Sequence, residues 1–262
     1  MSNVLSVITP IYAPAATYLS EAYESLVAQR LPDGWDLEWL VQEDSETGSI
    51  EKLLPKNDPR IRLGTGRHGG PEVARNLALA RARGSIVKVL DADDMLCPDA
   101  LSRDIKILSE HPDVIWTTSR VIDLLPDGST VGFDYDPPEG KLTGADVFRH
   151  WREHEYRASV HPATLCVRRR ELLALGGWMA LPASGDTGLL ISLSVVSNGY
   201  FISEAGLYYR KWPEQVTGQT AHTHPVERAA RMKLIEDRAE ALLAVCHFDL
   251  PSSTLGQAAS TL

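Results

Sequence analysis

The chain has 262 residues, of which 44% are hydrophobic and 23% are charged, and its formal net charge is -9. This composition is ordinary for a globular protein and excludes wholesale disorder; the length suits one α/β domain with a small elaboration, or two small domains. The acidic balance argues against nucleic acid as the partner, because binding along a phosphate backbone requires a basic face. A single nucleotide is still compatible, since a metal ion, a few basic groups and helix N-termini can hold its diphosphate.

The first half of the chain alternates between strand and helix patterns. Short apolar runs bounded by turn residues predict strands at residues 4–8, 37–41, 61–63 and 86–90. Apolar residues at helical spacing predict helices at residues 18–29, 50–54, 71–83 and 98–111. This order predicts a Rossmann-like α/β fold with a mostly parallel central sheet flanked by helices. Because ligands bind at the carboxyl ends of the strands in such sheets, the residues that follow each strand are the first candidates for a site.

The second half is less regular. Strands are expected at residues 114–118, 121–125, 130–133, 163–167, 200–203 and 207–210. Helices are expected at residues 145–151, 169–175, 187–197 and 226–245, with a Pro-, Gly- and acid-rich loop at 134–140 and a frayed tail at 251–262.

The cysteines and the N-terminal residues give an expectation for the cellular compartment of the protein. Cys97, Cys166 and Cys246 are far apart and odd in number, which favours neither a disulfide framework nor a zinc site. The N-terminus runs directly into an apolar strand pattern without a signal peptide, and no stretch is long and apolar enough to span a bilayer. We therefore expect a cytoplasmic protein with no transmembrane segment.

An acidic cluster, Asp91-Ala92-Asp93-Asp94, follows the predicted strand at residues 86–90. Three carboxylates within four residues repel one another, so a cation is expected to compensate them. Mg²⁺ or Mn²⁺ takes oxygen ligands, keeps phosphate oxygens in its shell, and stabilises charge on a diphosphate leaving group. The alternative is a loop in which Asp93 or Asp94 caps the following helix, and we favour the metal site.

This stretch resembles the D-x-D motif of family 2 glycosyltransferases, which have the GT-A fold. In that family a helix containing Ala-Arg-Asn and a closing glycine precede the motif, as Ala74-Arg75-Asn76 and Gly84 do here. Residues 7–12 resemble the family's first-strand motif, and residues 41–45 resemble its acidic pair after the second strand. The resemblance covers roughly residues 4–210, and its motifs are most specific in the first hundred.

The resemblance implies an enzyme that moves a sugar from a nucleotide-diphosphate sugar, with a UDP-sugar expected, to a hydroxyl of a small-molecule or glycan acceptor. An inverting outcome is expected, the retaining one stays open, and so does assembly into a homo-oligomer. Residues 1–112 would form the nucleotide-sugar-binding half of one GT-A domain, residues 113–224 the acceptor-binding half, and residues 225–262 a C-terminal helix and tail.

The family pattern implies a nucleobase site at the ends of the first two strands. Asp44 would accept a hydrogen bond from the uracil ring, and the side chains of Pro10 and Tyr12 would line the pocket around that ring. The sequence departs from the family here, because Glu43 replaces the commoner aspartate and Ser45 follows Asp44 without the usual glycine.

The family pattern also implies a site for the ribose and the diphosphate. Asp91 and its neighbour Ala92 would contact the nucleoside, and Arg75 would approach the nucleotide. Asp93 would bind the Mg²⁺ or Mn²⁺ that bridges the diphosphate. Some family members add a C-terminal histidine as a further metal ligand, which His222 would supply here; a solvated loop histidine is the alternative.

An inverting transfer needs a carboxylate that deprotonates the acceptor hydroxyl. The family places an acidic pair, commonly Glu-Asp, at the start of a helix that follows a Gly-Gly-aromatic segment. Residues 176–178 match that segment, Asp186 matches the second acid, and Gly185 stands at the first. Asp186 is therefore the candidate catalytic base, with a role as the N-cap of the following helix as the alternative.

Two other functions share this pattern. A nucleotidyltransferase normally carries a glycine-rich, basic loop after the first strand, whereas residues 9–14 contain neither glycine nor a basic residue. A non-catalytic sugar-nucleotide-binding module would have lost the base or the metal acid, whereas Asp93 and Asp186 are both present. The transferase is the favoured interpretation.

Overall fold

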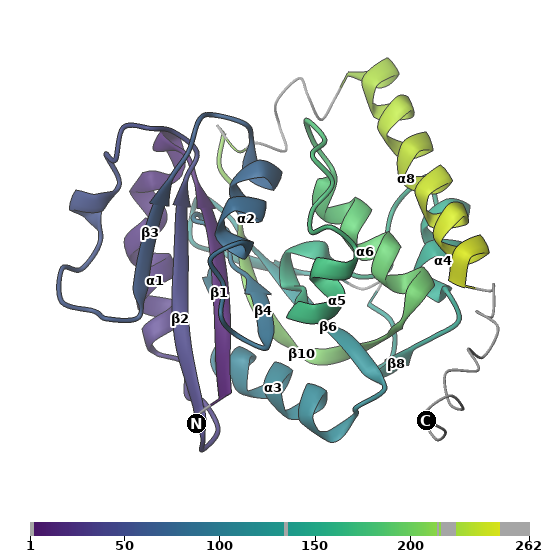
Figure 1. The fold of residues 1–262 in the computed structure, drawn as a ribbon, viewed down its shortest axis with the longest axis horizontal. Helices are drawn as coiled ribbons and strands as arrows, with labels where there is room; N and C mark the ends of the chain where they lie inside the picture. Colours follow the sequence, from purple (N-terminus) through teal and green to yellow (C-terminus); the bar gives the residue numbers. More distant parts are fainter. Residues whose placement is uncertain (1–2, 134–135, 214, 216–223, 247–262) are drawn as a thin grey trace, which may run out of the picture.

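The computed structural model describes residues 3–133, 136–213, 215 and 224–246. These residues form an α/β fold around a curled central sheet (Figure 1), in the strand order β3-β2-β1-β4-β9-β6-β10-β5. The strands are β1 (Asn3–Ile11), β2 (Trp35–Glu43), β3 (Ile61–Thr65), β4 (Ile86–Val89), β5 (Met95–Leu96), β6 (Val114–Leu124), β9 (Cys166–Arg168) and β10 (Asn198–Arg210). Two short strands, β7 (Thr130–Gly132) and β8 (Gly140–Leu142), pair with β6 and β10.

The expected mostly parallel sheet is confirmed. β1 pairs in parallel with β2 and β4, and β2 pairs in parallel with β3. β6 and β10 are also parallel, while the three-residue strand β9 runs antiparallel to both β4 and β6. Since parallel neighbours end at the same edge, the segments that follow β1, β2 and β4 come together there.

Helices cover both faces of the sheet because successive strand side chains point to opposite sides. From β1, Leu5 and Val7 join the core beneath α1 (Leu19–Val27) and α3 (Ala100–Glu110), and Ile8 joins the core on the other face. The second face is covered by α2 (Pro71–Leu79), α4 (Asp146–Glu153), α5 (Arg169–Ala174), α6 (Gly185–Val196) and α8 (Pro225–Cys246). Three 3₁₀ segments complete the described elements, η1 (Ala13–Tyr18), η2 (Glu51–Leu53) and η3 (Pro162–Thr164).

Several predicted boundaries in the second half were wrong. The two strands expected within residues 114–125 are the single strand β6, which pairs with β10 past the polar residues Ser119 and Arg120. The two strands expected within residues 200–210 are likewise the single strand β10, whose pairing shifts register near Ala205. The predicted strand 163–167 is split between η3 and β9, and β8 begins within the predicted loop. The tail at 251–262 lies outside the described residues.

Helix α2 ends at Leu79, four residues earlier than expected, and turns lead to Gly84. This glycine passes directly against β1, because a Cβ on it would lie 2.6 Å from the backbone nitrogen of Ser6 and 2.7 Å from the carbonyl oxygen of Val4. The absence of a side chain therefore allows the chain to enter β4 beside β1.

A buried ion pair explains the lysine within the apolar pattern of β4. Lys88 Nζ lies 2.7 Å from Asp104 Oδ2 on α3 and donates to the carbonyl oxygen of Thr164, also at 2.7 Å. Asp104 Oδ1 accepts the hydroxyl of Thr117 at 2.6 Å. The pair thus connects β4, α3, β6 and η3, and every polar atom in it has a partner, as burial of charge requires.

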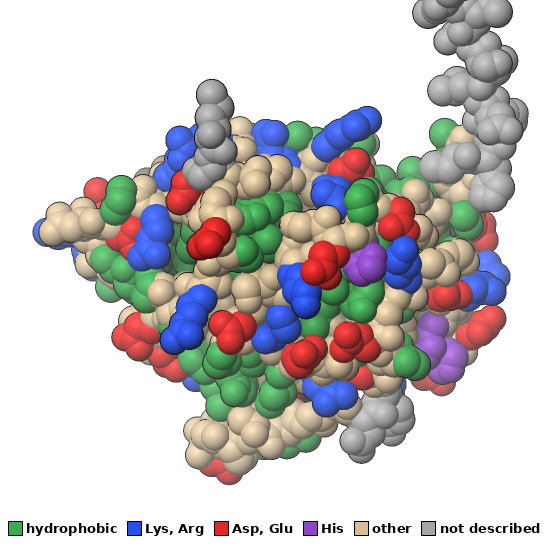
Figure 2. Space-filling model, turned by 90° about the horizontal axis from the view of Figure 1, so that it is seen from below, with side chains coloured by type: hydrophobic (Ala, Val, Ile, Leu, Met, Phe, Trp, Pro, Cys, Tyr) green, Lys and Arg blue, Asp and Glu red, His purple; other side chains and the backbone are tan. Residues whose placement is uncertain are grey.

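Surface charge is mixed. On the face shown in Figure 2, acidic and basic side chains of the described residues are interspersed and form no extended basic patch. In the part of the chain that the structure describes, no helix combines the length and the apolar character that crossing a membrane requires.

A second buried acid gives a testable pH dependence. Burial by itself would raise the pKa of Glu38 on β2, but hydrogen bonds from Ser6, from the Arg83 backbone, and from the Arg62 and Arg83 guanidinium groups lower this pKa to about 2. Because the pKa of Glu38 is lower in the folded state than its ordinary value of 4.5, the ionised carboxylate stabilises the folded protein. This contribution is complete above pH 4.5 and is lost as the pH falls from 4.5 through about 2.

Between pH 6 and pH 3, we expect the unfolding free energy of the wild type to fall by about 1 kcal/mol more than that of Glu38→Gln. This value includes a discount for solvent screening, because the side chain of Arg83 is largely exposed. Urea unfolding of both proteins at several pH values measures this difference. Parallel pH profiles of the two proteins would contradict the expectation.

Candidate active site

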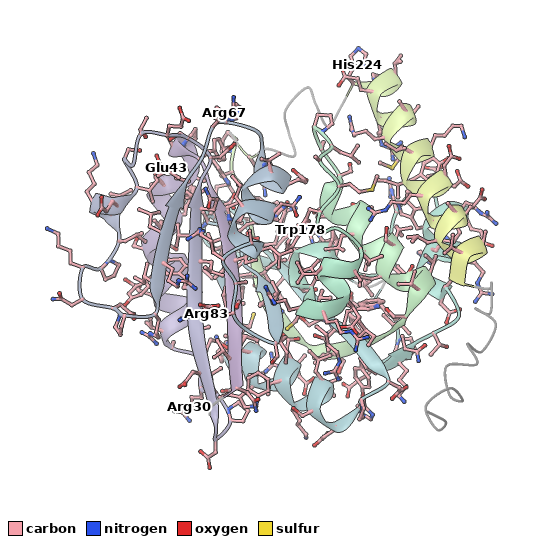
Figure 3. The ribbon with its side chains drawn as sticks, viewed as in Figure 1. Arg30, Glu43, Arg67, Arg83, Trp178 and His224 are labelled. Atoms are coloured by element: carbon pink, nitrogen blue, oxygen red, sulfur yellow. The ribbon has the colours of Figure 1, made fainter. Side chains whose placement is uncertain are left out.

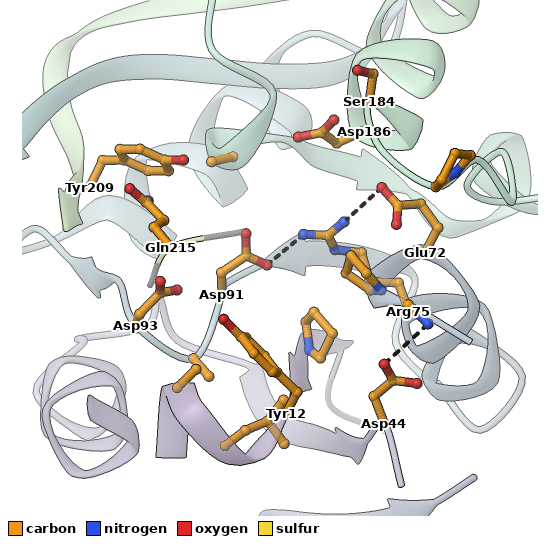
Figure 4. A pocket seen from close by; sticks show the side chains of 18 of the residues that line it. Tyr12, Asp44, Glu72, Arg75, Asp91, Asp93, Ser184, Asp186, Tyr209 and Gln215 are labelled. Carbon is orange, nitrogen blue, oxygen red and sulfur yellow. Dashed lines mark hydrogen bonds and ion pairs between the residues drawn. The ribbon is translucent and has the colours of Figure 1, made fainter. Parts of the chain in front are cut away.

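The carboxyl ends of β1, β2 and β4 open onto a cavity of about 270 Å³ (Figure 4). Its walls also include α2, the start of α6, η3 and the end of β10. Eight of the nine residues that the sequence suggested for the site line this cavity, namely Pro10, Tyr12, Asp44, Arg75, Asp91, Ala92, Asp93 and Asp186. The ninth, His222, lies outside the described residues. The fold therefore gathers residues from both halves of the chain around one space.

Asp44 holds the turn that precedes α2. Its Oδ1 accepts the backbone N–H of Gly69 at 2.8 Å, and its Oδ2 accepts that of Gly70 at 3.1 Å. The Nδ1 atom of the exposed His68 lies 2.8 Å from Oδ2. Gly70 has a φ of 89°, which an L side chain rarely adopts, so glycine is needed for this turn. Because a carboxylate has about four lone-pair positions, Asp44 retains acceptor capacity beyond these three partners.

Glu43, the neighbour of Asp44, forms hydrogen bonds to the loop that follows β2. Figure 3 shows it at the carboxyl end of β2, and it does not belong to the cavity lining. Its Oε1 accepts hydrogen bonds from Ser45, Thr47 and Ser49, so it organises the loop that follows β2. Burial would raise the pKa of Glu43, and these hydrogen bonds lower it. The longer glutamate reaches this loop, while Asp44 faces the cavity.

An ion-pair chain crosses the cavity wall. Asp91 Oδ1 accepts from Arg75 Nη2 at 2.6 Å, and Arg75 Nη1 lies 3.8 Å from Glu72 Oε1. Burial raises the pKa of Glu72 to about 7; the positive charge of Arg75 opposes this shift, and the negative charge of Asp186 adds to it. The chain runs from Asp91 after β4, through Arg75, to Glu72 in the first turn of α2 (Figure 4).

The acids after β4 differ in their surroundings. Asp93 lines the cavity, and its Oδ2 accepts the indole N–H of Trp212 at 2.7 Å. Burial, together with the charge of Asp91, raises the pKa of Asp93. Asp94 is buried, and its Oδ1 accepts the backbone N–H of Arg210 at 2.9 Å. Neither acid caps α3, because Asp99 occupies the N-cap position. The helix-cap alternative for this cluster was wrong.

Asp186 enters the cavity from the other side, in the first turn of α6. Its Oδ1 accepts the backbone N–H of Thr187 at 2.6 Å. Ser184, with a φ of 66°, is the N-cap, so the alternative role of Asp186 as N-cap was wrong. The carboxylate is half-buried and lies on the same cavity wall as Glu72 in Figure 4.

The loop before α6 is fixed to α2 by a two-bond clamp. Asn76 Oδ1 accepts the backbone N–H of Trp178 at 3.0 Å, and Asn76 Nδ2 donates to the Trp178 carbonyl oxygen at 2.9 Å. Gly177 has a φ of 73°, and a Cβ on it would collide with Asn76 Oδ1. The Ala-Arg-Asn segment and the Gly-Gly-Trp segment, about a hundred residues apart, therefore hold each other. Trp178 lies between α2 and α6 in Figure 3.

Glu72 and His161 also line the cavity. Glu72 precedes Arg75 by one helical turn, an i,i+3 spacing that predicts an ion pair on a helix surface but does not predict its burial. His161 is the N-cap of η3, and its Nδ1 accepts the backbone N–H of Ala163 at 3.2 Å, which leaves the proton of the neutral ring on Nε2. Burial lowers the pKa of His161.

The protein is an α/β protein with a cavity at the carboxyl ends of its parallel strands, and comparison with known proteins identifies the family. The family model described as glycosyl transferase family 2 matches residues 6–173. The match covers more than half of the chain, so the chain belongs to glycosyl transferase family 2.

Relatives and solved structures agree with this assignment. A chondroitin synthase of Pasteurella multocida (strain Pm70) is 33% identical over 159 residues, which cover 56% of this chain and 16% of that protein. A putative teichuronic acid biosynthesis glycosyltransferase, TuaG of Bacillus subtilis (strain 168), is 33% identical over 112 residues, 41% of this chain and 43% of that one. The chain therefore spans only a part of these relatives.

A crystal structure of S. aureus TarS residues 1–349, in complex with UDP-GlcNAc, superposes with a TM-score of 0.69. The match covers 94% of this chain and 71% of that chain, at 19% sequence identity. This likeness establishes the GT-A-type fold.

Proposed function

We propose that the chain is a glycosyltransferase that takes a sugar from a UDP-sugar and transfers it, with inversion, to a hydroxyl of a glycan or a small molecule. The observation that carries this proposal is the single cavity that joins the strand-end residues Asp44, Arg75 and Asp91 to Asp186 on α6. Family membership supports the donor class, and so does the crystal structure of TarS in complex with UDP-GlcNAc.

In the proposed donor site, the ring of Tyr12 and the ring of Pro10 flank the nucleobase, and a free lone pair of Asp44 accepts a base N–H. Arg75, held between Asp91 and Glu72, presents positive charge beside the nucleotide while Asp91 accepts from the ribose. Residues 1–112 then form the donor half, residues 113–224 the acceptor half, and residues 225–262 the C-terminal part.

The residues after β4 fit a hard divalent cation that shares its shell with the diphosphate. Among the described residues, no group of three His, Cys, Asp or Glu side chains is arranged to hold a metal. Mg²⁺ commonly binds through one or two carboxylates and completes its shell with phosphate oxygens and water. Asp93 is the proposed ligand, with Asp91 beside it. When bound, Mg²⁺ or Mn²⁺ would neutralise the charge that develops on the departing diphosphate.

The chemistry is assigned to Asp186. An oxygen of its carboxylate takes the proton of the acceptor hydroxyl as that hydroxyl oxygen forms a bond to C1 of the sugar. The bond from C1 to the diphosphate oxygen breaks, and the electron pair leaves with the nucleoside diphosphate. The backbone N–H of Thr187 holds the carboxylate, and the Asn76 clamp holds the loop that leads into α6.

Calorimetric titration of the wild type with UDP, GDP and dTDP, with and without Mn²⁺, tests the donor assignment. We expect UDP to bind most tightly and Mn²⁺ to strengthen its binding. If no nucleoside diphosphate binds, the transferase proposal is wrong. A nucleotidyltransferase would instead bind nucleoside triphosphates and release pyrophosphate, and a non-catalytic module would bind UDP-sugars without ever releasing UDP.

A further inference from the structure

Glu72, in the cavity lining, has a carboxylate oxygen without a hydrogen-bond partner among the described residues. It lies in the first turn of α2, lines the cavity and is 3% exposed. Its Oε1 accepts the backbone N–H of Gly185 at 3.2 Å, and its buried Oε2 has no hydrogen-bond partner among the described residues. A buried carboxylate oxygen without a partner is costly, which is accounted for if a ligand supplies the hydrogen bond.

The chain leaves room for this side chain. A Cβ on Gly185 would collide with the Cγ of Glu72 and with the carbonyl oxygen of Met179. The position just before Asp186 therefore stays without a side chain, and an acid from α2 fills the space beside the proposed base. The carboxylates of Glu72 and Asp186, which come from positions more than a hundred residues apart, stand next to each other on one wall (Figure 4).

The charges around these two acids are unbalanced. Among the described residues that line the cavity, Arg75 is the one arginine, and its guanidinium group is already paired with Asp91 at 2.6 Å and with Glu72 at 3.8 Å. Burial lowers the pKa of His161, which favours its neutral form. The sugar end of the cavity is thus acidic, with no spare cation on its described walls.

We propose that Glu72 is a specificity-determining residue whose Oε2 accepts a hydroxyl hydrogen bond from the transferred sugar, and that the acids around it restrict the donor to uncharged sugars. A sugar hydroxyl donating to a carboxylate makes a charge-assisted hydrogen bond. The carboxylate of a uronic acid would instead meet Asp91, Asp186 and, above its pKa of about 7, the ionised Glu72, and like charges repel. This inference rests on the proposed UDP-sugar donor and names its sugar class.

The test compares the wild type with Glu72→Gln by calorimetry in Mn²⁺ at about pH 8, above the pKa of Glu72. The probes are UDP, UDP-glucose, UDP-GlcNAc and UDP-glucuronic acid. Glutamine keeps the size of the side chain and an amide oxygen for the Gly185 N–H. We expect the wild type to prefer UDP-glucose or UDP-GlcNAc over UDP-glucuronic acid by at least about tenfold, and Glu72→Gln to reduce that ratio about tenfold. The affinity for UDP itself, which lacks a sugar, is expected to stay within about twofold. The control is Glu153→Gln, the same change at an exposed position of α4.

The outcomes separate this inference from the function on which it rests. If the wild type binds no nucleoside diphosphate and no UDP-sugar, both are overturned. If the wild type binds UDP and UDP-sugars, but Glu72→Gln leaves the ratio of neutral to acidic donors unchanged, the inference alone fails. Equal weakening of all four ligands assigns Glu72 a structural role at α6 and also overturns it. Thermal melting of both variants verifies that they are folded.

Discussion

Asp186→Asn is expected to lower sugar transfer by two to four orders of magnitude, roughly the contribution of a general base, while UDP binding stays within about twofold of the wild type. The asparagine amide cannot take a proton from the acceptor hydroxyl. Its carbonyl oxygen can still accept the Thr187 N–H that Asp186 Oδ1 accepts now, so the first turn of α6 is preserved. The effect should therefore appear in kcat and not in the affinity for the nucleotide.

The measurement follows UDP release from UDP-GlcNAc and UDP-glucose in the presence of a panel of glycan acceptors, with calorimetry of UDP alongside it. Asp146→Asn is the matched control, because Asp146 is also an aspartate in the first turn of a helix, α4, and it lies outside the cavity lining. Turnover of Asp186→Asn equal to that of the control would remove Asp186 from the role of base.

Asp93→Ala is expected to abolish the Mn²⁺-dependent part of UDP binding, with a loss of affinity of about a hundredfold or more. In the wild type, burial and the neighbouring Asp91 raise the pKa of Asp93, which reflects the cost of keeping negative charge in this wall without a cation. A divalent ion held by Asp93 would relieve that cost and would stabilise the charge of the diphosphate, whereas alanine would offer such an ion no ligand.

Removal of the carboxylate also deprives the Trp212 indole N–H of its acceptor, so a second variant separates the two effects. Asp93→Asn keeps an oxygen for Trp212 and loses the charge, and we expect it to lose the Mn²⁺ dependence as well. Asp99→Asn, an exposed acid at the start of α3, is the control. Titrations are run in Mn²⁺ and in EDTA. If the wild type binds UDP with the same affinity in Mn²⁺ and in EDTA, the proposed metal role of Asp93 is contradicted.

Local patterns predicted most of the first half of the fold. Each expected strand up to residue 90 is present, because a short apolar run between turn residues has few other ways to bury its side chains. The gathering of Pro10, Asp44 and Asp91 at one edge then followed from parallel strand order alone. Their roles toward a nucleotide stay predictions.

The second half was predicted less well because its elements depend on partners. β6 continues through Ser119 and Arg120, where the local pattern breaks, since its hydrogen bonds are made with the neighbouring β10. β10 continues through residues 203–206 in the same way, with shifts in register. A β-ladder is held by its neighbour, so the hydropathy of one strand does not determine where that strand ends.

The sequence by itself determined the α/β class, the acids at the strand ends and the family, since each of these depends on residues within a few positions of one another. Only the tertiary structure decided which side chains meet across the cavity. Asn76 binds the backbone of Trp178, Trp212 binds Asp93, and Glu72 fills the space that Gly185 leaves beside Asp186. The physical reason is the distance along the sequence over which each effect acts. Hydrophobic periodicity and turn preference depend on residues a few positions apart. The contacts across the cavity join segments about a hundred positions apart, which come together only when the whole core packs closely.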